Sequence, residues 1–483
     1  MKELIEPLQW IGEISTISLP HKLFRKFLNS RYSFFLESGG SVGDFSRYSF
    51  IGSEPFLVFR SKGKQIEICE GDRSERFSGD PFDVLKMFIS QYSLASSGHS
   101  PFPGGAVGYF GYDLCHFVEK LPRNSFDDLQ LPDCYLGFYD LVVTFDHLTG
   151  RLFISSSGLR EKEPARRRER AKWHLEETLD ILNRDSREDL SVSEEHNIAE
   201  ISSNFSRSAY LDAIERAKEY IRAGDIFQVN LSQRFVCSRM TLPFIIYEKL
   251  RRINPAPFAS FLNFPEVTIV SASPERFLRI SGRKVQTRPI KGTRPRGGDS
   301  LEDSQLAREL LESEKDKAEL IMIVDLERND LGRVCEYGSV RVPKLITLET
   351  YPTVFHLVST VEGVLKEDKD HIDCLRACFP GGSITGAPKI RAMEIIDELE
   401  PNQRGAYTGS IGYIGFNGET DLNIVIRTMV MTGEKIYFHA GGGIVADSDP
   451  ATEYEETLHK AKALIKTLTI EKGREALIHP GSL

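Results

Sequence analysis

Hydrophobic residues in the first third of the chain occur in short runs that are separated by turn residues. Residues 32–36 (YSFFL), 56–59 (FLVF) and 101–114 (PFPGGAVGYFGYDL) are examples. Short apolar runs bounded by glycine, proline and polar residues are typical of β-strands. The pattern therefore predicts a β-rich region over about residues 1–155.

From residue 160 the pattern changes to a helical period in REKEPARRRERAKWHLEETLDIL, which predicts a charged helix. The next residues, NRDSREDLSVSEEHN, are polar and aperiodic and predict a surface linker or mobile insertion. The basic string ARRRER is one candidate for a nucleic-acid contact. Acidic residues follow on the same helix, which favours a solvated helix face instead.

A second region with sharper periodicity begins near residue 205. Ser206 or Ser208 is the candidate N-cap of an amphipathic helix (YLDAIERAKEYIRA), Gly224 is its C-cap, and the strand-like run IFQVNLSQRF follows. Hairpins and helices then alternate, which predicts an α+β layered fold rather than regular βαβ winding. We expect strands at 258–263, 267–272, 276–280, 410–416, 422–430 and 435–440, and helices near 301–314, 388–399 and 452–468.

Length and charge narrow the classes of function. The chain has 483 residues, enough for two domains or one two-lobed unit, and its net charge of −9 disfavours a broadly basic nucleic-acid surface. No run approaches the roughly 18 apolar residues of a membrane span, and the start of the chain lacks the apolar core of a secretory signal. We therefore expect a cytoplasmic protein that binds neither membrane nor nucleic acid.

The seven cysteines are odd in number and form no CxxC pair, which predicts reduced thiols. His371, Cys374 and Cys378 have a spacing that would suit one face of a helix and so imitate a metal site. No fourth ligand is nearby, so buried helix residues are the favoured interpretation.

Two pairs of carboxylates have helical spacing. Asp316 and Glu319 lie in KDKAELIMIVDLERNDLGRV, and Glu453 and Glu456 lie in EYEETLHKAKAL. Each pair would share one helix face, and two such helices offer only oxygen ligands, which favours Mg²⁺. Solvated helix faces are the alternative interpretation.

The segment HAGGGIVADS contains Gly441, Gly442 and Gly443, which could form a backbone nest for a carboxylate or phosphate at the end of a strand. A tight turn explains the glycines equally well. Arg427, at the end of the apolar run LNIVIRT, requires an anionic partner, which is either a ligand or an internal aspartate.

Lys291, in VQTRPIKGTRPRGG, follows an apolar run and precedes a glycine. Burial and the neighbouring Arg288, Arg294 and Arg296 would favour the neutral amine and make it a nucleophile. An exposed strand lysine is the alternative.

Taken together, these motifs resemble the chorismate-utilising enzymes, which include component I of anthranilate synthase, component I of aminodeoxychorismate synthase, and isochorismate and salicylate synthases. The resemblance runs in family order from about 206 to 465 and extends to the N-terminal region through FFLESG, FSRYSFIG and GGAVGYFGYDL. The matching catalytic-region strings are SASPERF, PIKGTRPRG, AELIMIVDLERNDLGRV, HLVSTVEG, GGSITGAPKIRAME, RGAYTGSIGY, DLNIVIRT and HAGGGIVADSDPATEYEET.

The resemblance implies a large two-lobed α+β fold in which antiparallel β-sheets pack as a sandwich with helices outside. It divides the chain into an N-terminal lobe (1–160), a charged helix and linker (161–203), a catalytic domain (204–472) and a tail (473–483). It also implies that chorismate is the substrate and Mg²⁺ the cofactor. The implied metal ligands are Glu319 and Glu456, with Asp316 and Glu453 close by, and the implied substrate contacts are Gly292, Thr293, Tyr407, Arg427 and Gly441, Gly442 and Gly443.

Lys291 resembles the lysine of the aminodeoxychorismate synthase branch, where anthranilate synthases typically carry alanine. Asn230, Ser383 and Thr385 also resemble that branch. The resemblance then implies that Lys291 forms a covalent adduct at C2 of chorismate, with Glu275 as general acid. His356 matches a histidine linked to pyruvate elimination in anthranilate synthases, and for it we expect an orienting role.

No cysteine lies in a Gly-x-Cys-x-Gly elbow, so the resemblance implies that a separate glutamine amidotransferase subunit supplies ammonia. It further implies a tryptophan pocket, which holds either bound tryptophan or protein side chains, formed by Ser38, Arg47, Tyr48, Pro257 and Phe258. Three alternatives remain open: anthranilate synthase component I, an isochorismate or salicylate synthase, and a non-catalytic subunit that binds chorismate or tryptophan.

Overall fold

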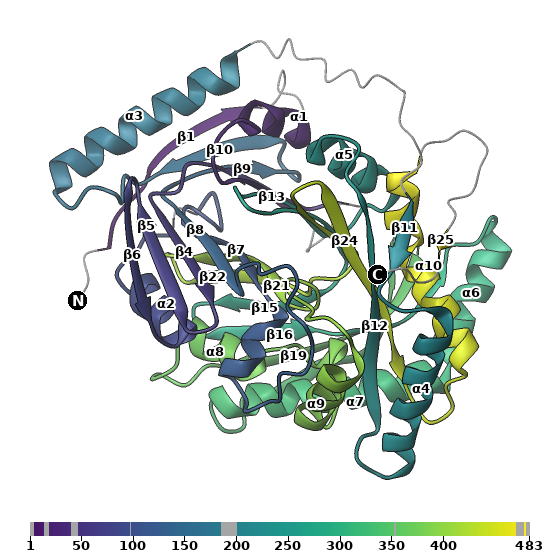
Figure 1. The fold of residues 1–483 in the computed structure, drawn as a ribbon. Coiled ribbons are helices and arrows are strands. Elements are labelled where there is room, and N and C mark those ends of the chain that lie inside the picture. Colours follow the sequence, from purple (N-terminus) through teal and green to yellow (C-terminus); the bar gives the residue numbers. More distant parts are fainter. Residues whose placement is uncertain are drawn as a thin grey trace.

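The computed structural model describes residues 4–13, 19–39, 47–96, 98–184, 200–351, 354–469 and 478–479. Two large β-sheets dominate this part of the chain, and helices cover their outer faces (Figure 1). All strand pairs are antiparallel except β11 with β25. The predicted α+β sandwich of antiparallel sheets with helices outside is confirmed.

The first sheet has 13 strands and includes both early and late parts of the chain. Its order is β1 (Leu8–Glu13), β10 (Arg151–Ser156), β9 (Leu141–Asp146), β3 (Tyr48–Gly52), β2 (Ser33–Glu37), β13 (Phe258–Asn263), β14 (Thr268–Ser273), β23 (Thr428–Thr432), β24 (Lys435–Ile444), β12 (Gln228–Ser238), β11 (Ile201–Ser203) and β25 (Ile478–His479), with β20 (Gly386–Ala387) beside β12.

The second sheet has 12 strands and is mixed in the same way. Its order is β17 (Ile290–Pro295), β19 (Val354–Val364), β16 (Lys284–Arg288), β15 (Arg276–Ser281), β22 (Glu419–Asn423), β21 (Ser410–Gly415), β7 (Gly105–Phe110), β8 (Cys134–Tyr139), β4 (Leu57–Lys62), β5 (Gln65–Glu70) and β6 (Arg73–Ser78), with β18 (Arg341–Thr350) beside β19.

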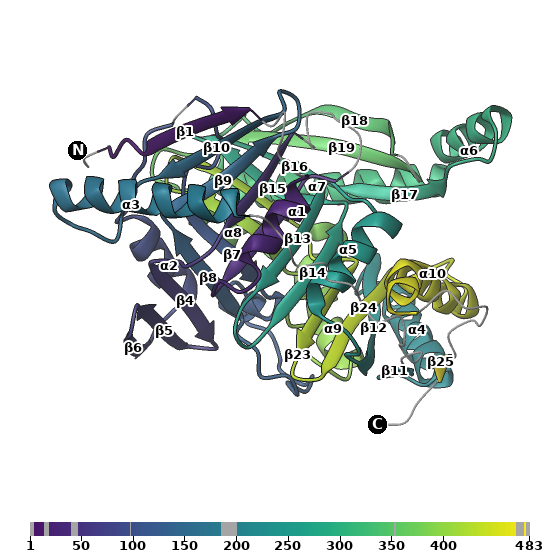
Figure 2. The same cartoon turned by 90° about the horizontal axis from the view of Figure 1, so that it is seen from above.

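The helices lie on the outside of this sandwich (Figure 2). They are α1 (Pro20–Phe24), α2 (Pro81–Ile89), α3 (Pro164–Asn183), α4 (Arg207–Arg222), α5 (Pro243–Ile253), α6 (Ser300–Glu312), α7 (Glu314–Val334), α8 (His371–Cys378), α9 (Lys389–Leu399) and α10 (Pro450–Leu468), with short 3₁₀ turns η1 (Arg25–Phe27), η2 (Tyr112–Phe117) and η3 (Gly382–Ile384).

Aromatic and branched side chains from both sheets meet in the core between them. Phe34 and Leu262 of the first sheet pack in one buried cluster with Tyr109, Tyr135 and Tyr139 of the second. Burying an aromatic side chain of this size contributes about 2 to 3 kcal/mol each, and large aromatic rings fill most of this layer. The sheets are therefore fixed face to face, and residues in the links between them have defined positions.

Two of those links run side by side. Pro274 and Glu275 connect β14 in the first sheet with β15 in the second, and residues 424–427 connect β22 in the second sheet with β23 in the first. The Ile424 N–H donates to the Glu275 carbonyl (3.0 Å) and the Ala272 N–H donates to the Arg427 carbonyl (3.1 Å). We call these two segments the central crossings.

The central crossings correct one prediction. The apolar run at 422–430 was expected to form a single strand, but it is two strands in different sheets, because the chain leaves one sheet after Asn423 and joins the other at Thr428. Arg427 has φ of +51°, which no strand residue adopts, and so ends any regular pairing there. Hydrophobic periodicity does not distinguish a long strand from two strands joined through the core.

Most other predicted elements are confirmed within a few residues. The helix expected after residue 205 is α4, and its N-cap is Ser206, whose Oγ accepts from the Ala209 N–H at 3.1 Å. Cys374 and Cys378 are buried residues of α8, and all seven cysteines are free thiols. The polar segment expected after α3 falls mainly on 185–199, which lies outside the described residues. Within the described ranges, no helix combines the length and apolarity needed to cross a bilayer.

Candidate active site

A cavity of about 620 Å³ lies where the central crossings meet the two sheets. Its walls come from β12 and β24 of the first sheet, β17 and β19 of the second, and the helices α7 and α10. This size suits a small organic ligand. The cavity gathers predicted site residues that are as much as 226 positions apart in sequence, between Asn230 and Glu456.

Lys291 and Glu275 are the central pair of the cavity. The Lys291 amine donates to the Ser383 carbonyl at 3.2 Å, and the Glu275 carboxyl, only 5% exposed, accepts from the Ile290 N–H at 3.5 Å. Burial lowers the pKa of Lys291, and the charges of Glu319 and Glu275 oppose that change without cancelling it. Burial raises the pKa of Glu275, which Ser383 and Lys291 only partly offset. Burial thus shifts both groups toward their uncharged forms.

The sequence attributed part of this effect to nearby arginines, and that part is wrong. Arg288 pairs with Glu349, Arg294 with Asp316 at 3.3 Å, and Arg296 with Asp303 at 2.6 Å. Each guanidinium is thus neutralised by its own carboxylate. Lys460 is the cationic group that acts on Lys291.

A β-bulge positions Lys291. β17 pairs Lys291 with Leu357 and Thr293 with His356, so Gly292 is an extra residue in the ladder. Gly292 has φ of +72°, and a Cβ there would lie 2.8 Å from Leu310 and 3.0 Å from Asp316. Only glycine fits, and the bulge kinks the strand at the lysine.

His356 and Thr293 form a second polar pair in the cavity, joined by a hydrogen bond of 2.9 Å between Oγ1 and Nδ1. Burial lowers the pKa of His356 to about 4, and the charge of Arg427 adds to this effect. The imidazole is therefore neutral near pH 7, which suits hydrogen bonding to a ligand better than proton donation.

Arg427 lines the cavity without a carboxylate partner among the described residues. Its pKa is lowered by burial alone, so no internal aspartate neutralises it. The sequence left a ligand and an internal aspartate as alternatives for its partner, and only the ligand remains. A half-buried guanidinium without a counter-ion is a site for an anionic group.

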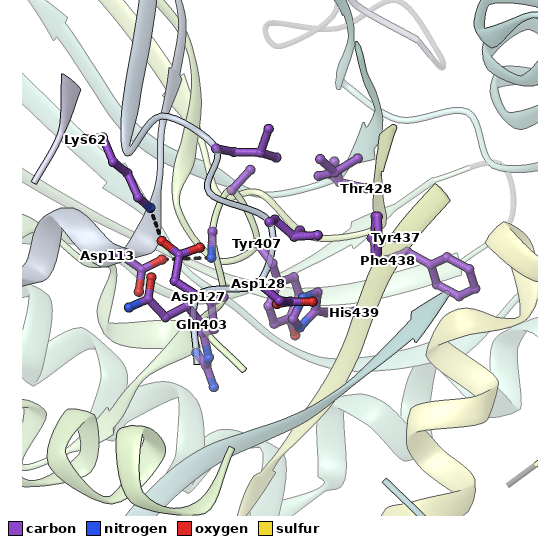
Figure 3. A pocket seen from close by; sticks show the side chains of 16 residues that line it. Lys62, Asp113, Asp127, Asp128, Gln403, Tyr407, Thr428, Tyr437, Phe438 and His439 are labelled. Atoms are coloured by element: carbon purple, nitrogen blue, oxygen red, sulfur yellow. Dashed lines mark hydrogen bonds and ion pairs between the residues drawn. The ribbon is translucent and has the colours of Figure 1, made fainter. Parts of the chain in front are cut away.

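Tyr407 and His439 stack in the cavity wall, with ring centroids 4.6 Å apart. They also border a second, small cavity of about 30 Å³, where Asp113 and Asp127 lie near Lys62 (Figure 3). Burial lowers the pKa of His439 well below its usual value, so this ring is neutral as well.

Arg404 fixes the loops behind this stack. Its guanidinium donates to the carbonyls of Asn230 (2.7 Å) and Ile384 (3.1 Å) and pairs with Glu400 at 2.6 Å. Arg404 is 3% exposed and makes contacts on every side. This role was not predicted, because the local pattern RGAY is typical of an ordinary turn.

The four predicted metal-site carboxylates line one side of the cavity, from α7 and α10. Each has a polar neighbour: Gln228 Nε2 donates to Glu319 at 3.5 Å, Arg294 pairs with Asp316, Ser448 donates to Glu453 at 2.6 Å, and Lys460 pairs with Glu456 at 2.6 Å. Lys460 was missed in the sequence, although its i,i+4 spacing from Glu456 is a usable signal.

The oxygen atoms of these carboxylates are suitable ligands for a hard cation, but the carboxylates do not form a complete coordination sphere. Within the described ranges no three His, Cys, Asp or Glu side chains converge on one metal position. Mg²⁺ usually takes one or two protein carboxylates and completes its shell with water and substrate. A Cβ at Gly442 would lie 3.1 Å from Glu453 and 3.6 Å from Glu456, so glycine leaves room for both carboxylates. The residues therefore fit a magnesium ion shared with a bound ligand.

The three glycines form neither the nest nor the tight turn expected from the sequence, and their contact with the substrate stays a prediction. Gly441, Gly442 and Gly443 lie inside β24 and pair with Ser232, Leu231 and Asn230 of β12. Their role is close packing: a Cβ at Gly441 would lie 2.5 Å from the Leu231 carbonyl, and one at Gly443 would lie 2.2 Å from Gln228. Gly441 and Gly443 still line the cavity, as flat backbone wall.

The predicted tryptophan pocket forms a separate cavity of about 70 Å³ between the sheets. Ser38, Tyr48, Pro257 and Phe258 line it. Arg47 does not line it, because its guanidinium pairs with Asp146 at 2.9 Å and stacks on Tyr48.

The fold with its cavity between two sheets is that of a known class of enzyme. A solved structure of anthranilate synthase component I from Streptococcus pneumoniae TIGR4 aligns with a TM-score of 0.78 and 33% identity over 88% of this chain and 93% of its own. The model of the chorismate binding enzyme family matches residues 33–466, so the chain belongs to the chorismate-binding enzymes.

Curated relatives lie in two branches of this family. Anthranilate synthase component 1 of Acetivibrio thermocellus is 43% identical over 93% of this chain and 92% of its own length. Aminodeoxychorismate synthase component 1 of Escherichia coli (strain K12) is 40% identical over 92% of this chain and 95% of its own length. Overall similarity therefore identifies the class of substrate but does not distinguish the two reactions. Individual residues must be compared for that.

We predict that Arg427→Met raises the KM for chorismate by about tenfold or more, because a charge-assisted hydrogen bond contributes about 1.5 to 3 kcal/mol. The melting temperature should be unchanged, since no described carboxylate loses its partner. Steady-state kinetics and a thermal melt check both statements, with Arg73→Met, an exposed arginine of β6, as the control. An unchanged KM would mean that Arg427 does not bind the substrate.

Proposed function

We propose that this chain is component I of an aminodeoxychorismate synthase, which converts chorismate and ammonia into 4-amino-4-deoxychorismate. The observation that carries the proposal is Lys291, a cavity lysine whose pKa is lowered by burial and which lies with a buried carboxylic acid in one site. A lowered pKa increases the fraction of the neutral, nucleophilic amine.

The first displacement forms a covalent adduct. The neutral Lys291 amine attacks C2 of the ring while both ring double bonds shift and the C4 hydroxyl leaves. Glu275 donates its proton to that hydroxyl, which departs as water. Lys291 is then a secondary ammonium bonded to C2, and Glu275 is a carboxylate.

The second displacement restores the enzyme. Ammonia attacks C4, both ring double bonds shift back, and the bond from C2 to Lys291 breaks, so the lysine leaves as a neutral amine. The new C4 ammonium returns a proton to Glu275. The net change is replacement of hydroxyl by amine with release of water, and the enolpyruvyl ether is not broken.

The remaining residues orient the substrate. Arg427 would hold one carboxylate, and the neutral pair of Thr293 and His356 would position the ring. Mg²⁺ held by Glu319 and Glu456 would neutralise the ring carboxylate. Glu456 already pairs with one cation, the Lys460 ammonium at 2.6 Å, which supports its assignment as a ligand of a cation.

Anthranilate synthase component I is the second candidate, because relatives of both kinds have similar identity to this chain. His356 favours this second candidate, because it matches a histidine linked to pyruvate elimination in anthranilate synthases. With a pKa of about 4, the imidazole is neutral near pH 7 and carries no proton to donate as an imidazolium acid.

The adduct provides the direct test. Wild-type protein incubated with chorismate and without ammonia should gain a covalent mass in an intact mass spectrum, and Lys291→Ala should not. Lys315→Ala is the matched control, because Lys315 lines the same cavity and should leave the adduct in place. An adduct that persists in Lys291→Ala would refute the mechanism.

Product analysis separates the two candidate functions. With chorismate, ammonium and Mg²⁺, the proposed enzyme forms para-aminobenzoate only after aminodeoxychorismate lyase is added. Fluorescent anthranilate formed without the lyase would establish the second candidate instead.

The metal proposal predicts that chelation abolishes turnover and that Mg²⁺ restores it. Glu456→Gln should raise the half-saturating Mg²⁺ concentration at least about tenfold, by analogy with losses of ten- to a hundredfold for groups that support a metal. Glu455→Gln, an exposed neighbour on α10, should not. Equal dependence in both variants would remove Glu456 from the metal site.

We also propose a glutamine amidotransferase partner and a tryptophan bound near Ser38 and Phe258. Native mass spectrometry of protein purified from its own cells should show the heterodimer and a mass increment of one tryptophan. Glutamine-dependent turnover by the isolated chain would exclude the need for a partner. If the native mass after incubation with tryptophan equals that of the chain alone, bound tryptophan is excluded.

A further inference from the structure

A second large cavity, of about 600 Å³, lies beneath α3. It is nearly as large as the substrate cavity, and we call it the α3 cavity. In both overall views α3 lies at one end of the molecule and α6 and α10 lie at the other, so this cavity is remote from the site described above (Figures 1 and 2).

The α3 cavity has the same position in the fold as the active site. Residues 53–56 connect β3 in the first sheet with β4 in the second, and Asp140 connects β8 in the second sheet with β9 in the first. β3 pairs with β9 and β4 pairs with β8, as β14 pairs with β23 and β15 with β22 at the central crossings. We call these two links the outer crossings.

Each pair of crossings places a buried carboxylic acid at a cavity. At the central crossings this group is Glu275, and at the outer crossings it is Asp140, which is 2% exposed. One Asp140 oxygen lies 3.6 Å from His174 Nδ1, and Oδ2 has no hydrogen-bond partner among the described residues. A buried carboxylate with a free oxygen requires a donor from a ligand or water.

α3 supplies the complementary donor. Arg170 donates from its NH2 nitrogen to His174 Nε2 at 3.0 Å, and the other ring nitrogen, Nδ1, faces Asp140. The buried Arg170 Nε has no partner among the described residues. Three buried polar atoms at the floor of the cavity thus lack a hydrogen-bond partner among the described residues: the acceptor Asp140 Oδ2, the donor Arg170 Nε–H and His174 Nδ1.

The remaining lining combines aromatic rings and arginines with two acidic residues, Glu54 and Glu177. Trp173, which is 49% exposed and stacks on Arg170 at 4.5 Å, lines the cavity with Tyr32 and Phe56. Arg31 and Arg160 lie at the exposed rim and form no ion pair with a described carboxylate. Planar rings bind to aromatic side chains, and unpaired guanidinium groups bind phosphate or carboxylate.

We propose that the α3 cavity binds a planar N-heteroaromatic anion of the purine nucleotide type. A ring N–H donates to Asp140 Oδ2, a ring nitrogen or carbonyl accepts from Arg170 Nε, and the anionic group pairs with Arg31 and Arg160. One or two water molecules would satisfy the same two polar atoms, but they would leave the aromatic walls and the arginines of the rim without a function.

The test uses the full chain carrying Trp10→Phe, so that Trp173 is its only tryptophan. GMP and AMP are titrated by calorimetry and by Trp173 fluorescence, with guanosine, adenosine and inorganic phosphate as separate probes. We expect a saturable quench and heat with at least one nucleotide. The corresponding nucleoside should bind more weakly, and phosphate alone should not quench Trp173.

Asp140→Asn should weaken nucleotide binding by about tenfold or more, because the ring N–H then meets a group that has lost its charge. Arg31→Met should weaken binding of the nucleotide and leave binding of the nucleoside unchanged. Glu169→Gln, at an exposed position of α3 outside the cavity lining, is the matched control. Undiminished chorismate turnover shows that each variant is folded. If Asp140→Asn does not fold, Arg170→Met is used in its place.

Three results would overturn the proposal. The first is no binding of any nucleotide in calorimetry or fluorescence. The second is binding that phosphate alone reproduces, which would be an anion contact at the rim only. The third is equal affinity in wild type and Asp140→Asn.

Discussion

The site depends on the hydrogen-bonded contact between the two central crossings. A link that passes from one packed sheet to the other must travel through the core, where each backbone N–H and carbonyl needs a partner. Ile424 bonds to the Glu275 carbonyl and Ala272 to the Arg427 carbonyl, so each crossing satisfies the other. The same contact places the Glu275 carboxyl and the Arg427 guanidinium at one cavity. Both cavity side chains are thus held on backbone that the core itself fixes.

The electrostatic potential in the cavity depends on which charged side chains already have a partner of opposite charge. Arg294, Lys460 and Arg404 each have a carboxylate partner, while Arg427 has none among the described residues. The overall charge of −9 therefore says little about the ligand. A dianionic substrate meets a local field set by one unpaired guanidinium, a lysine and the helix carboxylates that suit a cation.

Sequence patterns predicted much of this arrangement, because helices and short strands have strong local signals. The pairs Asp316 with Glu319 and Glu453 with Glu456 lie on α7 and α10 as expected, and Lys291 lies in a cavity. The failures concern long-range structure. Residues 422–430 look like one strand because both halves are apolar, and glycines 441–443 look like a loop because their contact with β12 is invisible in the local sequence. Arg404 was missed for the same reason, since its partners are brought to it by the fold.

The mixing of early and late strands in both sheets also bears on how the chain folds during synthesis. β7, complete by residue 110, pairs with β21 at residues 410–415, and β2 pairs with β13 more than 200 residues later. Until those later segments leave the ribosome, the first strands present unpaired edges and apolar faces to water. The N-terminal lobe therefore cannot reach its final sheets on its own, and its early strands depend on protection from aggregation until most of the chain has been made.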